Sequence, residues 1–362
     1  MNIRILILAL AVITSGCAIK KESSTSGDPS LENRFEQELK TGENLIGQRQ
    51  YQKAEKHILS AVSLAKQFGS RDKRVASSLG DLALIYGARK EYKKAIEALE
   101  NALTIDRHIY GDEHEFVAYD LNNLGTFYDL IDEHEKARIN LEESVKIRNK
   151  LANLDPKSQR LLSVSLINLG ANCKYRKDFE RAVTLTEKAI EISRIAGDDD
   201  TAILYTRSLA DIYLASGKPE KIEQYIEEKL KTFTPEENKQ KGLASKLLLT
   251  AGNFYAERNN IEKSDEYFRK ALETARVNQG KDSRIVLGIT FTLVGNLIKQ
   301  KKFKAAIPYL QKLIEDDSFS NLEKPTQIDL YKHYAMCLYN SGEKKKSEEI
   351  TKKVMELQRN AR

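Results

Sequence analysis

Apolar residues recur at helical spacing in paired stretches along most of the chain. In one representative pair, Leu121, Leu124 and Tyr128 share a face of the first stretch, and Ala137 and Leu141 share a face of the second. Polar and charged residues fill most of the remaining positions. Each stretch therefore predicts one amphipathic helix, and each pair predicts two helices that pack through their apolar stripes.

Eight such pairs are marked by a small residue that is followed twelve positions later by a second small residue or its equivalent in register. The pairs are Gly42/Ala54, Ala83/Ala95, Gly125/Ala137, Gly170/Ala182, Ala210/Ile222, Gly252/Ser264, Val294/Ala306 and Ala335/Ser347. Their second members are 41, 42, 45, 40, 42, 42 and 41 residues apart. Small side chains let helix backbones approach closely, and a fixed period of this length is typical of a tandem array. The pattern predicts an all-α solenoid of about eight antiparallel helix pairs, with wider helix crossings where Ile222 and Val294 replace the small residue.

Glycines and capping residues predict where the helices begin and end. Gly217, Asn259 and Gly342 stand at the same point between the two helices of their repeats, where a left-handed residue ends the first helix. Asp155-Pro156 and Thr234-Pro235 have the form of an N-cap followed by proline at the first helical position. The second helices are expected to end at four glycines: Gly69, Gly111, Gly197 and Gly280.

The N-terminal residues do not follow the repeat pattern. Residues 1–16 contain an apolar run, Ile5–Ile13, which is shorter than the about 20 residues that a membrane-spanning helix needs. Ser15 and Gly16 precede Cys17, an arrangement that resembles the lipobox of bacterial lipoproteins and implies lipidation of Cys17 after cleavage. The alternatives are ordinary signal-peptide cleavage, an uncleaved anchor and a fortuitous resemblance. We expect residues 1–16 to be a signal peptide and residues 17–30 to be the lipidated cysteine with a flexible tether.

Charge and motif content narrow the possible functions. The net charge of +6 is small for 362 residues, and acidic and basic residues alternate along the predicted helices, so we expect solvated helix faces and no nucleic-acid partner. The five histidines have no metal-ligand spacing, and Asp198–Asp200 lacks the alternating ligands of a calcium loop. No phosphate-binding loop or nucleophile motif is present. We therefore predict no metal, no cofactor and no enzymatic activity.

Cys173 and Cys337 fall in apolar helical context in the fourth and eighth repeats. In a solenoid, each repeat contacts only its neighbours, so these two cysteines are expected to be buried and unbridged.

The segment from Tyr110 to Glu115, followed by Leu121-Asn122-Asn123-Leu124-Gly125, resembles the tetratricopeptide repeat family in its longer, kinesin-light-chain-like variant. The resemblance covers residues 31–357. It implies a right-handed superhelical solenoid, here expected over residues 31–358, with residues 359–362 as a basic tail. Glu115 departs from the variant, which usually has proline at this position.

In this family the first helix of every repeat lines a concave groove that binds a protein or peptide. Carried over by register, the resemblance implies that eight polar or aromatic residues contact a partner: Tyr119, Asn122, Thr126, Asp129, Lys174, Arg207, Asp211 and Asn253. Asn123 and Asn168, one position further along, are expected to be structural.

Together these features predict a lipid-anchored cell-envelope protein that acts as a scaffold or assembly adaptor. A regulatory sensor that closes around a peptide is the alternative. In a Gram-negative organism, Ala18 after Cys17 would favour the outer membrane, with the solenoid facing the periplasm.

Overall fold

The computed structural model of this protein describes residues 29–152, 156–280, 284–315, 319 and 322–359. The predicted signal peptide, Cys17, nearly all of the tether, Asp155 and the last three residues of the tail lie outside the described residues. Within the described ranges, all regular secondary structure is helical, which confirms the all-α prediction.

The chain divides into two units, one up to Gly217 and one from Lys218. The helices of the first unit are α2 (Pro29–Gly47), α3 (Tyr51–Phe68), α4 (Lys73–Ala88), α5 (Tyr92–Tyr110), α6 (Glu115–Leu130), α7 (His134–Leu151), α8 (Pro156–Tyr175), α9 (Phe179–Ile195) and α10 (Asp199–Ala215). Those of the second are α11 (Glu220–Thr232), α12 (Pro235–Lys241), α13 (Leu243–Glu257), α14 (Ile261–Gln279), α15 (Arg284–Lys299), α16 (Phe303–Glu315), α17 (Lys324–Asn340) and α18 (Lys344–Arg359).

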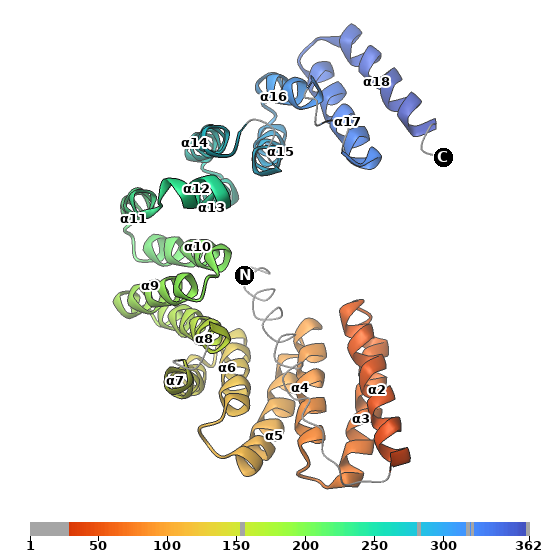
Figure 1. The fold of residues 1–362 in the computed structure, drawn as a ribbon, viewed down its shortest axis with the longest axis vertical. Coiled ribbons are helices and arrows are strands. Elements are labelled where there is room, and N and C mark those ends of the chain that lie inside the picture. Colours follow the sequence, from red (N-terminus) through yellow and green to blue (C-terminus); the bar gives the residue numbers. More distant parts are fainter. Residues whose placement is uncertain (1–28, 153–155, 281–283, 316–318, 320–321, 360–362) are drawn as a thin grey trace. The chain divides into compact units, whose positions relative to one another are not determined.

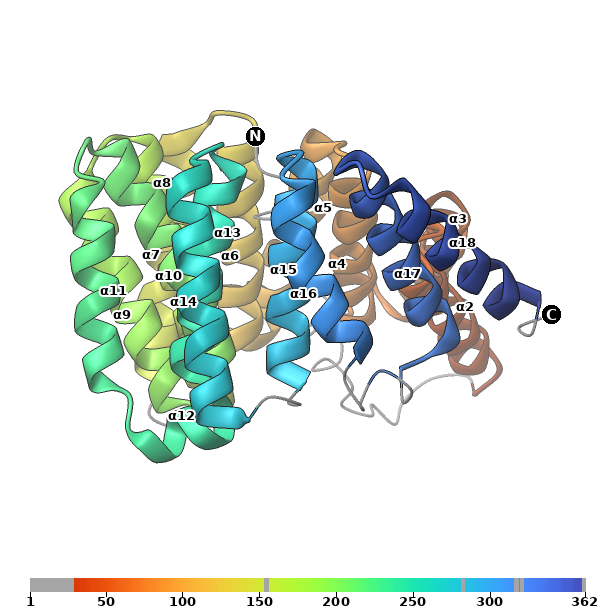
Figure 2. The ribbon, with the colours of Figure 1, turned by 90° about the horizontal axis from the view of Figure 1, so that it is seen from above.

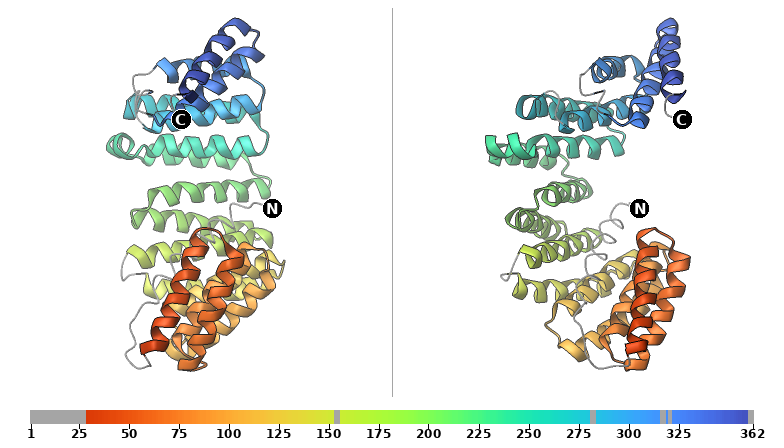
Figure 3. Two further views of the ribbon diagram at one scale, coloured as in Figure 1. Left: turned by 90° about the vertical axis from the view of Figure 1, so that its right-hand side faces the viewer. Right: turned by 45° about the vertical axis from the view of Figure 1, so that its right-hand side comes forward.

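Within each unit, most helices that follow one another in the chain pack side by side (Figures 1, 2 and 3). In the first unit, α2/α3, α4/α5, α6/α7 and α8/α9 form the predicted pairs, and each second helix also contacts the first helix of the next pair. The boundary between the two units falls in the chain between α10 and α11, the helices of the fifth predicted pair. The short helix α12 is an addition to the predicted pairs.

The small residues allow the close helix approach that the sequence predicts. A Cβ atom built on Gly42, Gly125, Gly170 or Gly252 would lie within 2.8 Å of a side chain on the second helix of the same pair. The side chain that it meets is always four residues beyond the second small residue, one helical turn along. These side chains are Ile58, Leu141, Thr186 and Phe268. Side chains on the second helix therefore fill the space that the glycine leaves open.

One backbone conformation recurs in all eight repeats, five residues before the second small residue. Arg49, Lys90, Asp132, Lys177, Gly217, Asn259, Lys301 and Gly342 all have φ between 57° and 89°. At the fourth of these positions, the amide of Lys177 donates to the carbonyl of Lys174 (3.0 Å) and that of Asp178 donates to Cys173 (2.9 Å). This pair of bonds is the Schellman arrangement that ends a helix. The left-handed position predicted at Gly217, Asn259 and Gly342 is thus confirmed.

The other helix boundaries also follow local signals. Gly69, Gly111 and Gly280 directly follow α3, α5 and α14, and Gly197 lies one residue further past α9. The hydroxyl of Thr234 accepts from the amide of Glu237 at 3.2 Å, forming a capping box with Pro235 in the first turn of α12. Capping at these ends satisfies backbone groups that a helix cannot satisfy within itself.

Cys173 and Cys337 are buried free thiols in different units, as predicted. None of the helices in the described ranges has the length and apolarity that a membrane span requires. Within the same ranges, no cluster of three or more histidine, cysteine or acidic side chains is suited to hold a metal ion.

Candidate functional site

The first helices of the pairs lie along one side of the first unit, which we call its inner face. Figure 1 shows α4, α6, α8 and α10 on this side and the second helices α5, α7 and α9 on the other. Some first helices also contact the next first helix directly, including α6 against α8 and α8 against α10. The groove positions predicted on α6, α8 and α10 all belong to this face, so the candidate site is built from three adjacent helices.

Amide and hydroxyl side chains join α6 to α8. The Oδ1 atom of Asn122 accepts hydrogen bonds from Asn168 Nδ2 (3.0 Å) and Ser165 Oγ (3.1 Å). Asn168 Nδ2 also lies 3.4 Å from the hydroxyl of Thr126. Asn122 is only 2% exposed, so these bonds are shielded from water. Asn168 is therefore structural, as predicted.

Two of the predicted partner-contacting residues are not accessible in this structure. Tyr119 is 6% exposed and Asn122 is 2% exposed, because α8 packs over this part of α6. Their assignment to the binding surface is corrected: Asn122 forms part of the contact between neighbouring repeats. Thr126 and Asp129 retain partial exposure, but both also take part in that contact.

Asp129 is the centre of a partly buried polar cluster at the end of α6. Its Oδ1 atom accepts from Asn172 Nδ2 (2.7 Å) and from His134 Nδ1 (2.8 Å), and Asn172 donates to the His134 carbonyl at 3.0 Å. Burial raises the pKa of Asp129, and the hydrogen bonds from His134 and Asn172 oppose part of that rise. The His134 ring stacks on Tyr175, with centroids 5.3 Å apart. The cluster fixes the end of α6 against α8.

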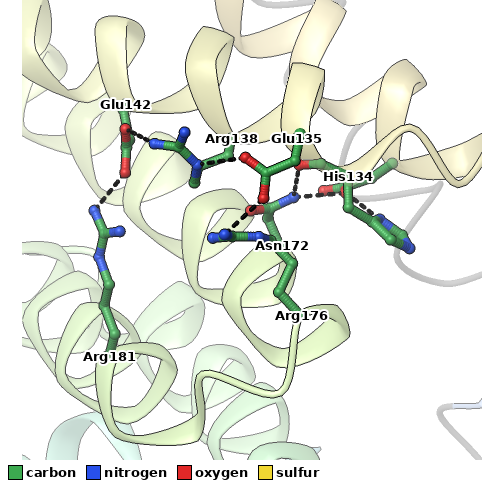
Figure 4. Close-up of polar contacts among 8 residues, drawn as sticks. His134, Glu135, Arg138, Glu142, Asn172, Arg176 and Arg181 are labelled. Atoms are coloured by element: carbon green, nitrogen blue, oxygen red, sulfur yellow. Dashed lines mark hydrogen bonds and ion pairs between the residues drawn. The ribbon is translucent and has the colours of Figure 1, made fainter.

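A chain of ion pairs continues from this cluster along α7 (Figure 4). Arg176 Nη2 lies 2.6 Å from Glu135, which also accepts from Arg138 Nε at 3.0 Å. Arg138 then pairs with Glu142, and Glu142 pairs with Arg181 of α9, each at 2.7 Å. Because these residues belong to two consecutive helix pairs, the chain links one repeat to the next. Exposed pairs of this kind contribute little individually, and their geometry mainly fixes orientation.

The open part of the inner face lies between α8 and α10. A small pocket there is lined by Ile167, Asn168, Ala171, Lys174, Thr186, Tyr205, Ser208, Asp211 and Ile212. Lys174 and Asp211 thus contribute opposite charges to one surface depression. The ammonium of Lys174 lies 5.1 Å from the ring centroid of Tyr175, which is 44% exposed. Lys174 and Asp211 were both predicted from the sequence as partner-contacting residues. The structure places them near the ring of Tyr175, which the sequence did not predict.

Exposed leucines extend this surface along α10. Leu204 and Leu214 are 40% and 43% exposed, and they occupy the same face of the helix as Arg207 and Asp211. Arg207 is half-buried. Asn253 is also half-buried, but it lies on α13 in the second unit, so it is not part of this cluster. The accessible surface on α8 and α10 is therefore mixed: it carries exposed leucines together with Lys174, Arg207 and Asp211.

Comparison with protein-family models gives matches to the tetratricopeptide repeat at residues 40–108, 74–150 and 245–278. The chain carries tetratricopeptide repeats, and the fold is a tetratricopeptide-repeat solenoid. This repeat is a protein-interaction fold and is typically not catalytic. A comparison with curated protein sequences finds no match.

Several solved structures are similar to this chain. The nearly identical TPR-like repeats of a Podosopora anserina kinesin light chain are 22% identical, with 54% of this chain and 92% of that one covered and a TM-score of 0.47. BtubC from P. vanneervenii is 20% identical over 64% of this chain and 94% of its own, with a TM-score of 0.48. A Rap protein complexed with competence and sporulation factor is 14% identical, with 90% of this chain and 75% of that one covered and a TM-score of 0.46.

Proposed function

We propose that this protein is a lipid-anchored scaffold or assembly adaptor of the cell envelope that binds a partner protein on the inner face of its first unit. The observation that carries the proposal is the surface between α8 and α10. It combines exposed leucines with Lys174, Asp211 and an exposed tyrosine.

The chemistry of this surface defines the partner. Leu204 and Leu214 offer apolar contact area, and Lys174 and Asp211 can each pair with one opposite charge on the partner. Apolar side chains that alternate with an acidic and a basic residue would match this arrangement, whether the partner segment is extended or helical. Charge pairs at the centre of an interface mainly set specificity, and the leucines would supply most of the buried apolar area.

The proposed anchor rests on the sequence around Cys17. The apolar run before it and the small residues Ser15 and Gly16 support lipidation, and the tether that follows would leave the solenoid free to meet its partner. In a Gram-negative cell, Ala18 would direct the protein to the outer membrane, with the solenoid in the periplasm.

The experiment is crosslinking in native membranes followed by affinity purification of the full chain. Lys174→Glu reverses the charge at the pocket and should remove the specific partner from the crosslinked set. The matched control is Lys188→Glu, which makes the same change at an exposed position on α9. If both variants retain the wild-type partners, the surface between α8 and α10 is not the binding site.

The same purified complex separates the scaffold from the regulatory alternative. A scaffold keeps its radius of gyration when the partner segment is added. A clear compaction in small-angle scattering would instead support the peptide-responsive sensor.

A further inference from the structure

The pocket between α8 and α10 contains a buried hydroxyl group whose hydrogen-bonding capacity is not used. Of the lining residues that the structure describes, Thr186 alone comes from α9. Thr186 is fully buried, and its Oγ1 atom has no hydrogen-bond partner among the described residues. Such a hydroxyl has lost its bonds to water without replacing them, which is unfavourable for the free protein. The pocket therefore offers an unsatisfied donor and acceptor to any group that enters it.

The hydroxyl of Thr186 points toward α8. A Cβ atom built on Gly170 of α8 would lie 2.8 Å from Thr186 Oγ1. Ile167 and Ala171 lie within one helical turn of Gly170, and both line the pocket. The hydroxyl is therefore within reach of a group that enters between α8 and α10.

The repeat register shows that Thr186 departs from the usual residue at its position. In six other repeats, the residue four positions beyond the second member of the pair is a large and almost fully buried apolar side chain: Ile58, Leu99, Leu141, Ile226, Phe268 and Leu310. In the eighth repeat it is Thr351, whose hydroxyl donates to the Ser347 carbonyl at 2.8 Å. Thr184 on α9 likewise donates to the Glu180 carbonyl at 3.0 Å. Thr186 thus combines a shorter side chain, which leaves space against α8, with a hydroxyl that its own helix does not satisfy.

The size and charge of the pocket limit what can enter it. Its volume is about 40 Å3, little more than the about 30 Å3 that a water molecule takes in the liquid, so it admits the end of one side chain. Lys174 and Asp211 contribute opposite charges. Burial raises the pKa of Tyr205 to about 12, so its phenol is neutral near neutral pH. The lining has no net charge, and a charged group attracted by one of the two ions would be repelled by the other.

We propose that this pocket receives the carboxamide of an asparagine or glutamine side chain of the partner protein. A carboxamide is neutral and carries both an acceptor and two donors in one small planar group. Its oxygen suits the ammonium of Lys174, its N–H groups suit the carboxylate of Asp211, and the hydroxyl of Thr186 can bond to either end. Ile167 and Ile212 offer apolar contacts to the methylene groups of the same side chain. The inference rests on the proposed function, because it assigns the pocket to the partner surface on α8 and α10.

The test is binding of small probes to the full chain, followed by NMR of the isoleucine methyl groups. The probe is N-acetyl-glutamine methylamide, and the glutamate and methionine derivatives of the same form are the charged and apolar references. We expect the glutamine probe to shift the methyl signals of Ile167 and Ile212 saturably, with an affinity several-fold above that of either reference. Absence of any shift, equal affinity for the glutamine and methionine probes, or a preference for glutamate would each overturn the proposal.

Two variants make the test specific for the hydroxyl. Thr186→Val removes it with little change in shape and should reduce the affinity for the glutamine probe to that for the methionine probe. The free protein should keep its Tm or gain slightly, because the hydroxyl that is lost had no partner. Thr184→Val makes the same change at an exposed position of α9 and should leave the glutamine preference intact. A preference that survives in Thr186→Val, or is lost equally in both variants, would contradict the assignment.

These probes are tested without the partner protein, so the pocket and the proposed function can fail separately. If the glutamine probe binds selectively while Lys174→Glu leaves the crosslinked partners unchanged, the partner surface is wrong. If Lys174→Glu removes the partner while the probes show no selectivity, the partner surface stands and the carboxamide assignment is wrong.

Discussion

A Cβ atom on Gly125 would lie 2.5 Å from Cγ of Leu141, which places α6 and α7 in direct backbone-to-side-chain contact. Gly125→Ala should therefore lower the free energy of unfolding of the first unit by about 1–3 kcal/mol, because Leu141 cannot move without disturbing a close-packed interior. Urea unfolding followed by circular dichroism measures the change.

The matched control is Gly80→Ala in α4. A Cβ atom at Gly80 meets no atom within 4 Å, so alanine should be neutral or should stabilise the helix by up to about 1 kcal/mol. Equal destabilisation by both substitutions would show that close helix approach is not the reason for glycine at position 125.

Asn172→Ala should destabilise the first unit by about 1–3 kcal/mol. The substitution removes a hydrogen bond to Asp129, whose carboxylate is largely buried, and another to the His134 carbonyl. Thermal or urea unfolding provides the measurement. Asn140→Ala, which removes a solvent-exposed amide bond to Lys136 on α7, is the control and should change stability far less.

Lys177→Gly should stabilise the first unit by about 1 kcal/mol, because a side chain is strained at the left-handed φ of 62° that this turn requires. Lys188→Gly, within α9, should have the opposite sign and cost about 1 kcal/mol. A loss of stability in both variants would mean that the turn does not hold its left-handed conformation in solution.

Burial raises the pKa of the Cys337 thiol to about 11. Only the thiolate is alkylated, so the native rate at pH 8 should be at least about 100-fold below that of the unfolded chain, whose thiol has a pKa of about 8.5. The native rate should then rise with pH up to about 11, whereas the unfolded rate levels off above about pH 9. Iodoacetamide labelling with peptide mass spectrometry measures Cys337 separately from the other cysteines, and equal rates in both states would contradict this burial.

Cys17→Ala should abolish acylation and release the protein from the membrane fraction. Mass spectrometry of the purified protein checks for the acyl chains, and fractionation of cells follows its location. If the variant remains in membranes and the wild-type protein carries no acyl mass, the lipoprotein proposal is wrong.

The repeat register predicted much of the fold because small residues and glycines have steric consequences that do not depend on distant contacts. Gly42 and Gly125 lie where the helices approach most closely, and Gly217 and Gly342 lie in left-handed turns. The left-handed conformation of the lysines in the equivalent turns was not predicted, because nothing in a lysine side chain indicates a positive φ. The left-handed conformation of Lys177 follows from its place in the repeat and from the helices on either side.

The candidate site was less predictable because burial depends on how neighbouring repeats pack. Register placed Asn122 and Lys174 at groove positions of successive first helices, but Asn122 is covered by α8 while Lys174 reaches a pocket. The contribution of Tyr175 also depends on packing, since its ring stacks on His134 of the preceding repeat. Asn168 and Asn172 lie one helical turn apart on α8. This spacing in the sequence could have indicated that amide side chains join α8 to α6.

The hydrogen bond between Asn122 and Asn168 belongs to one of two parts of the inner face, which differ in how firmly their side chains are held. On α6 and the adjoining side of α8, side chains are held in place before any partner arrives, so that part acts as a rigid template. On α10, the side chains of Leu204 and Leu214 are 40% and 43% exposed, so fewer neighbouring atoms restrict them. If the inner face binds a partner as proposed, α10 would accommodate partners that differ in the shape of an apolar side chain, whereas the template beside it would select for one backbone path.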